Sequence, residues 1–150
     1  MIDISKYYIV ILPLVVLTII RIIKFIIFFI RHGYDFNYAL EHGVTYGHMP
    51  SAHTGFVVSL VTSVGYYEGL NTGAFAVAVT FAILIIDDAV RLRMYLGDQG
   101  RYINMLTQEL NISEDKFPRL KERVGHRKAE IVVGGILGFI LTLAFATALS

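Results

Sequence analysis

Four stretches of the chain are almost wholly apolar, and polar segments separate them. They cover residues 8–30, 51–67, 73–90 and 131–149. At about 1.5 Å of rise per residue, the first stretch makes a helix long enough to cross a hydrocarbon core of roughly 30 Å. The pattern predicts an all-α integral membrane helical bundle with about four transmembrane helices, forming a single domain over residues 1–150.

The longest polar segment, 91–128, has apolar residues at helical spacing in its first part, 91–110. This spacing predicts an amphipathic helix near the membrane interface, with Gly97 and Gly100 as candidate break points. The segment 91–128 therefore adds an amphipathic element to the bundle.

Charge gives the bundle a predicted orientation. Nine of the thirteen Lys and Arg residues lie within 91–128, whereas the turn 68–72 has none. By the positive-inside rule the 91–128 segment is cytoplasmic, and an up-down topology places the loop 31–50 on the same side.

Composition supports the membrane interpretation. Hydrophobic residues make up 55% of the chain, and the mean hydropathy is +0.62. The absence of cysteine excludes disulfides and thiolate metal sites. A net charge of +1 gives no sign of a nucleic-acid partner, and none is expected.

Cations and a histidine stand at the predicted cytoplasmic ends of the first two helices. Lys24 and Arg31 are seven residues apart and share one stripe of the first helix. A charge within the membrane needs an opposite charge or contact with water. The Lys24 side chain could equally snorkel, which means that it extends along the helix to the headgroups. Ser51 is a candidate N-cap, and His53 follows in a first helical turn, where free N–H groups attract anions.

A histidine and a carboxylate share one face at the start of the fourth helix. His126 and Glu130 have the i, i+4 spacing. A carboxylate held against one imidazole nitrogen makes the other nitrogen a better nucleophile or base. An ordinary surface pair has the same spacing.

Two aspartates end the third helix. Asp87 and Asp88 are expected to pair with Arg91 and Arg93, although carboxylates could also hold Mg²⁺. Arg21 is a further candidate partner for either aspartate. In the predicted topology all these helix ends fall on one side, which favours a phosphate-handling site at one membrane face.

The residues resemble a known superfamily. Lys24-x6-Arg31, Pro50-Ser51-Ala52-His53 and His126-x3-Glu130 resemble the three signatures of type 2 phosphatidic acid phosphatases, whose superfamily includes vanadium haloperoxidases. The chain is still more similar to the divergent PAP2 family of small bacterial and plant membrane proteins. That likeness rests on Gly47-His48-Met49-Pro50-Ser51-Ala52-His53, Asp88, Arg93, Gly97-x-Gln99, Asn104 and Gly125-His126-x3-Glu130.

Three positions depart from the superfamily pattern. His32 replaces the proline after the first arginine, and Glu130 replaces an aspartate. Leu120 stands where the superfamily has an arginine, so that role passes to Arg93, Arg119 or Arg123.

The resemblance implies a metal-independent mechanism without a cofactor. His126 would attack phosphorus while Glu130 orients its ring, and His53 would protonate the leaving alkoxide and later activate water. The phosphate would be held by four residues: Lys24, Arg31, Ser51 and Arg93.

The expected function is a membrane phosphatase that hydrolyses a lipid phosphate monoester, such as phosphatidylglycerol phosphate, through a phosphohistidine. It would act at the cytoplasmic leaflet of a bacterial inner or plasma membrane. The alternatives are a polyprenyl diphosphate phosphatase and a non-catalytic protein that binds anionic headgroups. Gly134 and Gly138 form a small-x3-small step that predicts either a homodimer or close packing within the bundle.

Overall fold

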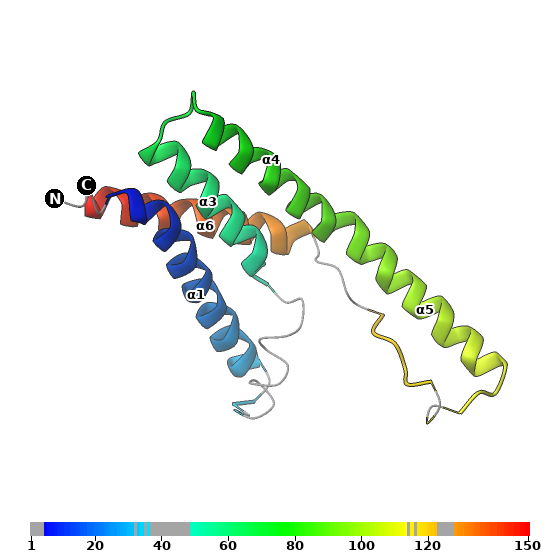
Figure 1. The fold of residues 1–150 in the computed structure, drawn as a ribbon. Coiled ribbons are helices and arrows are strands. Elements are labelled where there is room, and N and C mark those ends of the chain that lie inside the picture. Colours follow the sequence, from blue (N-terminus) through cyan, green and yellow to red (C-terminus); the bar gives the residue numbers. More distant parts are fainter. Residues whose placement is uncertain are drawn as a thin grey trace.

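The regular secondary structure of the described residues is entirely helical. The computed structural model describes residues 5–31, 33–34, 36, 49–113, 115, 117–122 and 128–150. Its helices are α1 (Ser5–Arg31), α3 (Ala52–Tyr67), α4 (Gly73–Asp87), the π-helical η1 (Asp88–Leu92), α5 (Arg93–Glu109) and α6 (Lys128–Leu149). The all-α prediction is confirmed, and Figure 1 shows both chain ends at the same end of the bundle.

Three helices among the described residues are long and apolar enough to cross a membrane. They are Tyr7–Arg31, the continuous helix Gly73–Glu109 and Lys128–Leu149. The helix α3, at 16 residues, rises only about 24 Å, which is less than the roughly 30 Å of a hydrocarbon core. Of the four predicted transmembrane helices, the second is therefore too short to span the core by itself.

The short helix α3 nevertheless forms the centre of the bundle. It contacts α1, α4 and α6 (Figure 1). Its buried side chains are mostly small: Ala52, Thr54, Gly55, Val57, Ser59, Ser63 and Val64. Small residues allow helix backbones to approach closely. Close packing of this kind holds helices together in lipid, where the hydrophobic effect does not drive their association.

Glycines set the distance between α3 and α6. A Cβ at Gly134 would collide with the carbonyl oxygen of Ser51, and one at Gly138 would collide with that of Gly55. Further along the same seam, Thr142 donates a hydrogen bond of 2.6 Å to Ser59. The prediction that these glycines pack within the bundle is confirmed, whereas the homodimer stays a prediction.

The predicted break at Gly97 and Gly100 is wrong. Residues 73–109 form one uninterrupted helix, in which a π-helical turn at η1 joins α4 to α5. Both glycines are buried in α5, and a Cβ at Gly100 would lie 2.8 Å from the carbonyl oxygen of Lys121. Gly100 thereby allows the returning segment 117–122 to lie against the helix.

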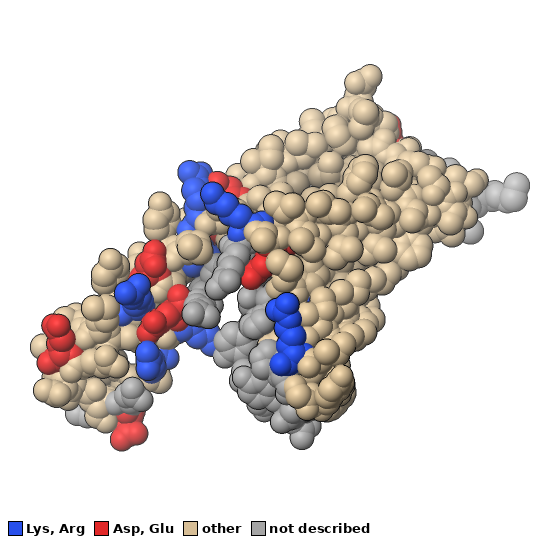
Figure 2. All heavy atoms as spheres, turned by 180° about the vertical axis from the view of Figure 1, so that it is seen from behind, with Lys and Arg blue, Asp and Glu red and all other residues tan. Residues whose placement is uncertain are grey.

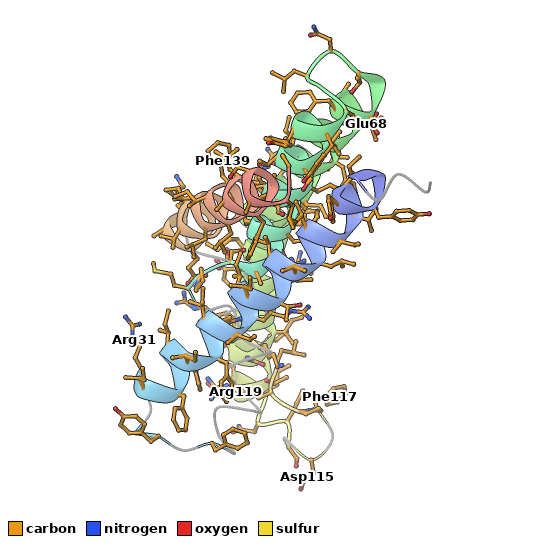
Figure 3. All side chains as sticks on the ribbon, turned by 90° about the vertical axis from the view of Figure 1, so that its left-hand side faces the viewer. Arg31, Glu68, Asp115, Phe117, Arg119 and Phe139 are labelled. Atoms are coloured by element: carbon orange, nitrogen blue, oxygen red, sulfur yellow. The ribbon has the colours of Figure 1, made fainter. Side chains whose placement is uncertain are left out.

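Charged side chains are concentrated at one end of the molecule. The helix α5 and the described part of the segment 110–122 project from the bundle as an arm (Figure 1). Figure 2 shows Lys, Arg, Asp and Glu over this arm, whereas the body of the bundle is almost free of them on this face. In Figure 3, Arg31, Asp115 and Arg119 lie at one end and Glu68 lies at the other. The end of α1 and the described part of the segment 110–122 therefore share one side, as the loop charges predicted.

Candidate functional site

The start of α3 is organised by its N-cap. Ser51 is fully buried, and its hydroxyl accepts from the Thr54 backbone N–H at 3.4 Å and bonds the Thr54 hydroxyl at 3.0 Å. Capping satisfies a backbone donor that the first helical turn leaves free. The predicted cap is confirmed. Ser51 reaches an incoming phosphate only if the helix start opens, because its hydroxyl is enclosed here.

The starts of α3 and α6 meet directly. The Ser51 backbone N–H donates to the Glu130 carbonyl oxygen at 3.0 Å, and the Glu130 side chain is buried. His53, in the first turn of α3, is exposed. The other predicted catalytic histidine, His126, lies outside the described residues. The second and third motifs are thus neighbours in space through Ser51 and Glu130.

Lys24 reaches the same place from α1. Its side chain is only 8% exposed, and the Glu130 carboxylate attracts its ammonium electrostatically. Burial of an ammonium costs several kcal/mol unless an opposite charge or hydrogen bonds compensate. Lys24 therefore points into the bundle, and its interpretation as a snorkelling lysine is wrong. Three helices and all three motifs contribute a buried residue to this cluster of Lys24, Ser51 and Glu130.

Arg31 lies apart from this cluster. It is exposed at the end of α1 (Figure 3). The seven residues from Lys24 correspond to about 10 Å along the helix axis. The shared stripe predicted for the two cations places one in the interior and the other at the surface. Only Lys24 is held by the bundle.

The aspartates at the end of α4 form ion pairs with nearby arginines. The Arg91 Nε lies 2.7 Å from the Asp87 carboxylate, and the Arg93 Nε lies 3.0 Å from that of Asp88. The favoured ion-pair interpretation is confirmed, with Arg91 and Arg93 rather than Arg21 as partners. Arg93 would have to exchange Asp88 for a phosphate in order to bind substrate.

The residues described contain no group of three or more His, Asp or Glu side chains placed to hold a metal ion. The aspartates are instead engaged by the arginines that follow them in the sequence.

Asn104 has a structural role that the motif reasoning did not assign to it. Its Nδ2 donates to the Leu120 carbonyl oxygen at 2.9 Å and to the Glu122 carboxylate at 3.0 Å, while Leu120 N–H donates to its Oδ1 at 2.9 Å. The hydrogen bond from Asn104, followed by that from Arg119, lowers the pKa of Glu122. The sequence feature that could have indicated this role is an asparagine one turn after Gly100 on the predicted amphipathic helix.

The residue that Asn104 binds is one of the departures from the superfamily pattern. At Leu120, where the superfamily has an arginine, it is the backbone that is bound. Arg119, one of the candidates for the missing role, pairs with Glu122 at 3.2 Å. Arg123, another candidate, lies beyond the described residues.

Comparisons with known proteins identify the family of the chain. A sequence profile of the divergent PAP2 family matches residues 5–141. The uncharacterized membrane protein YuiD of Bacillus subtilis (strain 168) is 38% identical over 112 residues, which cover 67% of this chain and 71% of that protein. No solved structure matches the chain.

Proposed function

The chain belongs to the divergent PAP2 family, and on that premise we propose that it is a membrane phosphatase for a lipid phosphate monoester. The observation that carries the proposal is the cluster of Lys24, Ser51 and Glu130. Each member comes from a different helix and a different phosphatase-like motif, and all three are buried. One residue of each signature lies in this cluster although the signatures are far apart in sequence, which supports a site built from all three.

The proposed reaction has two steps. A ring nitrogen of His126 attacks phosphorus, the bond from phosphorus to the lipid oxygen breaks, and His53 donates a proton to that oxygen. His53 then takes a proton from water, the water oxygen attacks phosphorus, and the bond to His126 breaks to release inorganic phosphate. The roles of the two histidines follow from the family resemblance and general acid–base chemistry.

Glu130 suits the role of orienting His126. It lies one helical turn after that residue, its side chain is buried, and its backbone is tied to Ser51. The buried ammonium of Lys24 attracts this carboxylate electrostatically. A carboxylate beside His126 stabilises the positive charge that its ring gains when the attacking nitrogen binds phosphorus.

Cations near the site would neutralise the phosphoryl oxygens as charge spreads in the transition state. Lys24 is buried beside Glu130, whereas Arg31 and Arg93 lie nearer the surface. An entering phosphate dianion would compete with Glu130 for Lys24 and with Asp88 for Arg93. These exchanges provide a way in which substrate binding reorganises the site.

The proposed substrate has its phosphate at the headgroup layer and its chains in the bilayer. Phosphatidylglycerol phosphate at the cytoplasmic leaflet of a bacterial plasma membrane fits this description, and a polyprenyl diphosphate is the alternative. The charged arm in Figure 2 favours a second candidate, a non-catalytic protein that binds anionic headgroups. Such a protein would not depend on its histidines.

The test is hydrolysis of a panel of lipid phosphates by the purified full chain in EDTA. His126→Ala should abolish turnover, and His42→Ala, which alters a histidine without an assigned role, should not. His53→Ala should retain partial activity on nitrophenyl phosphate, because nitrophenolate leaves with little protonation. Vanadate should inhibit, since its trigonal bipyramid imitates the transition state.

Three outcomes would redirect the proposal. Activity that vanishes in EDTA and returns with Mg²⁺ would move the chemistry to Asp87 and Asp88. Turnover by His126→Ala at the wild-type rate would eliminate the phosphohistidine mechanism. Retained headgroup binding without turnover by the wild type or any variant would favour the non-catalytic binder.

A further inference from the structure

The helix α5 carries a continuous apolar stripe that the described protein leaves uncovered. Seven large residues of η1, α5 and its C-cap form it, each 48–71% exposed: Leu92, Tyr95, Leu96, Tyr102, Ile103, Leu106 and Leu110. At about 100° per residue they fall within a sector of roughly 120°. This set is called the α5 stripe below.

A different face of α5 is covered by the chain itself. Gly97, Gly100 and Asn104 are its buried residues, and Asn104 holds the returning segment 117–122 there. The helix therefore has a polar, protein-covered side and an apolar, open side. The α5 stripe is larger than the scattered apolar residues that a protein surface in water usually carries.

Helix length places α5 outside the hydrocarbon core. The continuous helix Gly73–Glu109 has 37 residues and is about 55 Å long, whereas the core is roughly 30 Å thick. The ion pairs of Asp87 with Arg91 and of Asp88 with Arg93 stand between α4 and α5. Since charged groups gather where the chain leaves the hydrocarbon, α4 is the part of this helix that lies within the hydrocarbon.

We propose that α5 docks on the membrane surface as an interfacial helix. The α5 stripe lies at the boundary between headgroups and acyl chains, and the segment 117–122 lies on the water side. The occupant of the stripe is the lipid surface because the stripe continues a helix whose preceding turns, with exposed Val77, Phe81 and Leu84, already face lipid. Tyr95 and Tyr102 add the aromatic side chains that favour this layer.

In the structure α4 and α5 are in line (Figure 1), so docking of α5 on the membrane surface requires the helix axis to bend. The π-helical turn η1 is the place at which we expect this bend. A π-bulge is one of the few features at which helices kink, because it interrupts the regular i to i−4 hydrogen bonding. A bend at Asp88–Leu92 would let α4 enter the hydrocarbon while α5 follows the membrane surface.

This inference goes beyond the proposed phosphatase activity and does not depend on it. Surface docking fixes the depth of the segment that Asn104 holds. That segment leads along the chain toward the start of α6, where Glu130 lies. Docking of α5 would thereby keep the third motif, which includes Glu130, at the level of the lipid headgroups.

The test uses spin labels, since the chain contains no cysteine and single cysteines can be introduced cleanly. The full-length protein is reconstituted in vesicles of phosphatidylcholine and phosphatidylglycerol, with one label at Leu96, Ile103 or Leu110 of the α5 stripe. Matched controls carry the label at exposed polar positions of the same helix, Asp98, Arg101 or Gln108. A label at Phe81, near the middle of α4, supplies the deep reference.

Accessibility to oxygen and to a water-soluble nickel chelate gives the depth of each label. Labels in the α5 stripe should favour oxygen and share one shallow depth, whereas the polar controls should favour nickel. A depth change of about 10 Å for each seven residues would mean that α5 runs along the membrane normal. That outcome would overturn the proposal.

Two further outcomes would also overturn it. Nickel accessibility of the stripe equal to that of the polar controls would place α5 in water. Protection of the stripe from both reagents would mean that protein covers it, as in contact with a second copy of the chain. A monodisperse detergent-solubilised sample of each labelled variant confirms that folding is retained, because all the labelled side chains are exposed.

Discussion

The side-chain amide of Asn104 and the backbone of Leu120 exchange two hydrogen bonds of 2.9 Å each. The amide uses a donor and an acceptor in the way that a neighbouring strand would, which fixes both the position and the direction of residues 117–122. Gly100 makes the approach possible, since its missing Cβ leaves room for the Lys121 carbonyl. These hydrogen bonds join α5 to the returning segment 117–122.

Asn104→Leu should release the segment 117–122 from α5. The substitution removes both hydrogen bonds to Leu120 and leaves its backbone groups to find other partners, at a cost of about 1–3 kcal/mol. Trypsin should therefore cleave after Arg119 and Lys121 at least about 5-fold faster than in the wild type. The control is Gln108→Leu, a similar polar-to-apolar change at an exposed position of the same helix. Equal cleavage rates in both variants would contradict the clamp.

Acid should loosen the same contact through Glu122. Hydrogen bonds from Asn104 and Arg119 lower the pKa of Glu122 in the folded protein. A lowered folded pKa means that the stabilisation is complete above the ordinary value of about 4.3 and is lost as the pH falls through the folded pKa. A spin label at Phe117 should become more mobile below about pH 4.3. In Glu122→Gln, which cannot titrate, this acid-induced change should be absent.

Neighbouring glycines of α6 should respond oppositely to alanine. In Gly134→Ala the new Cβ meets the Ser51 backbone, which cannot move without shifting α3. The free energy of unfolding in detergent should therefore fall by about 1–3 kcal/mol. In Gly135→Ala the Cβ would lie 3.6 Å from Val58 and 3.7 Å from Thr54, which is ordinary contact. The higher helix propensity of alanine then leaves stability unchanged or raises it by up to about 1 kcal/mol. Equal destabilisation of both variants would argue against the close α3–α6 contact.

The charges of Lys24 and Glu130 should prove interdependent. Lys24→Met leaves the buried Glu130 without the ammonium that attracts it, and Glu130→Gln does the reverse, so each should destabilise the protein by roughly 3–5 kcal/mol. The double variant should lose less than the sum of the two, as a double-mutant cycle in detergent can measure. Additive losses would mean that the two charges do not interact.

The catalytic assay distinguishes this structural role from substrate binding. A folded Lys24→Met/Glu130→Gln variant that no longer hydrolyses lipid phosphate would indicate that Lys24 also serves the phosphate. Retained activity would confine Lys24 to the neutralisation of Glu130.

Features controlled by neighbouring residues were predictable from the sequence. The helix start at Ser51 and the pairing of Asp87 with Arg91 both depend on contacts within one or two turns, and both were predicted correctly. The apolar stretches also gave the helices, because their length and composition are sufficient to favour a membrane environment. The shortness of α3 was also visible in the sequence, since its apolar run covers only residues 51–67.

The sequence by itself determined an all-helical membrane protein with its charge at one end, because helical periodicity, capping and hydropathy act over a few residues. Only the tertiary structure decided whether Gly97 and Gly100 break a helix or admit a neighbouring segment, because that depends on what lies against them. It likewise decided that Lys24 points inward, since its electrostatic partner Glu130 stands near the other end of the chain. Burial joins residues that no local pattern relates, and the candidate site is made of such residues.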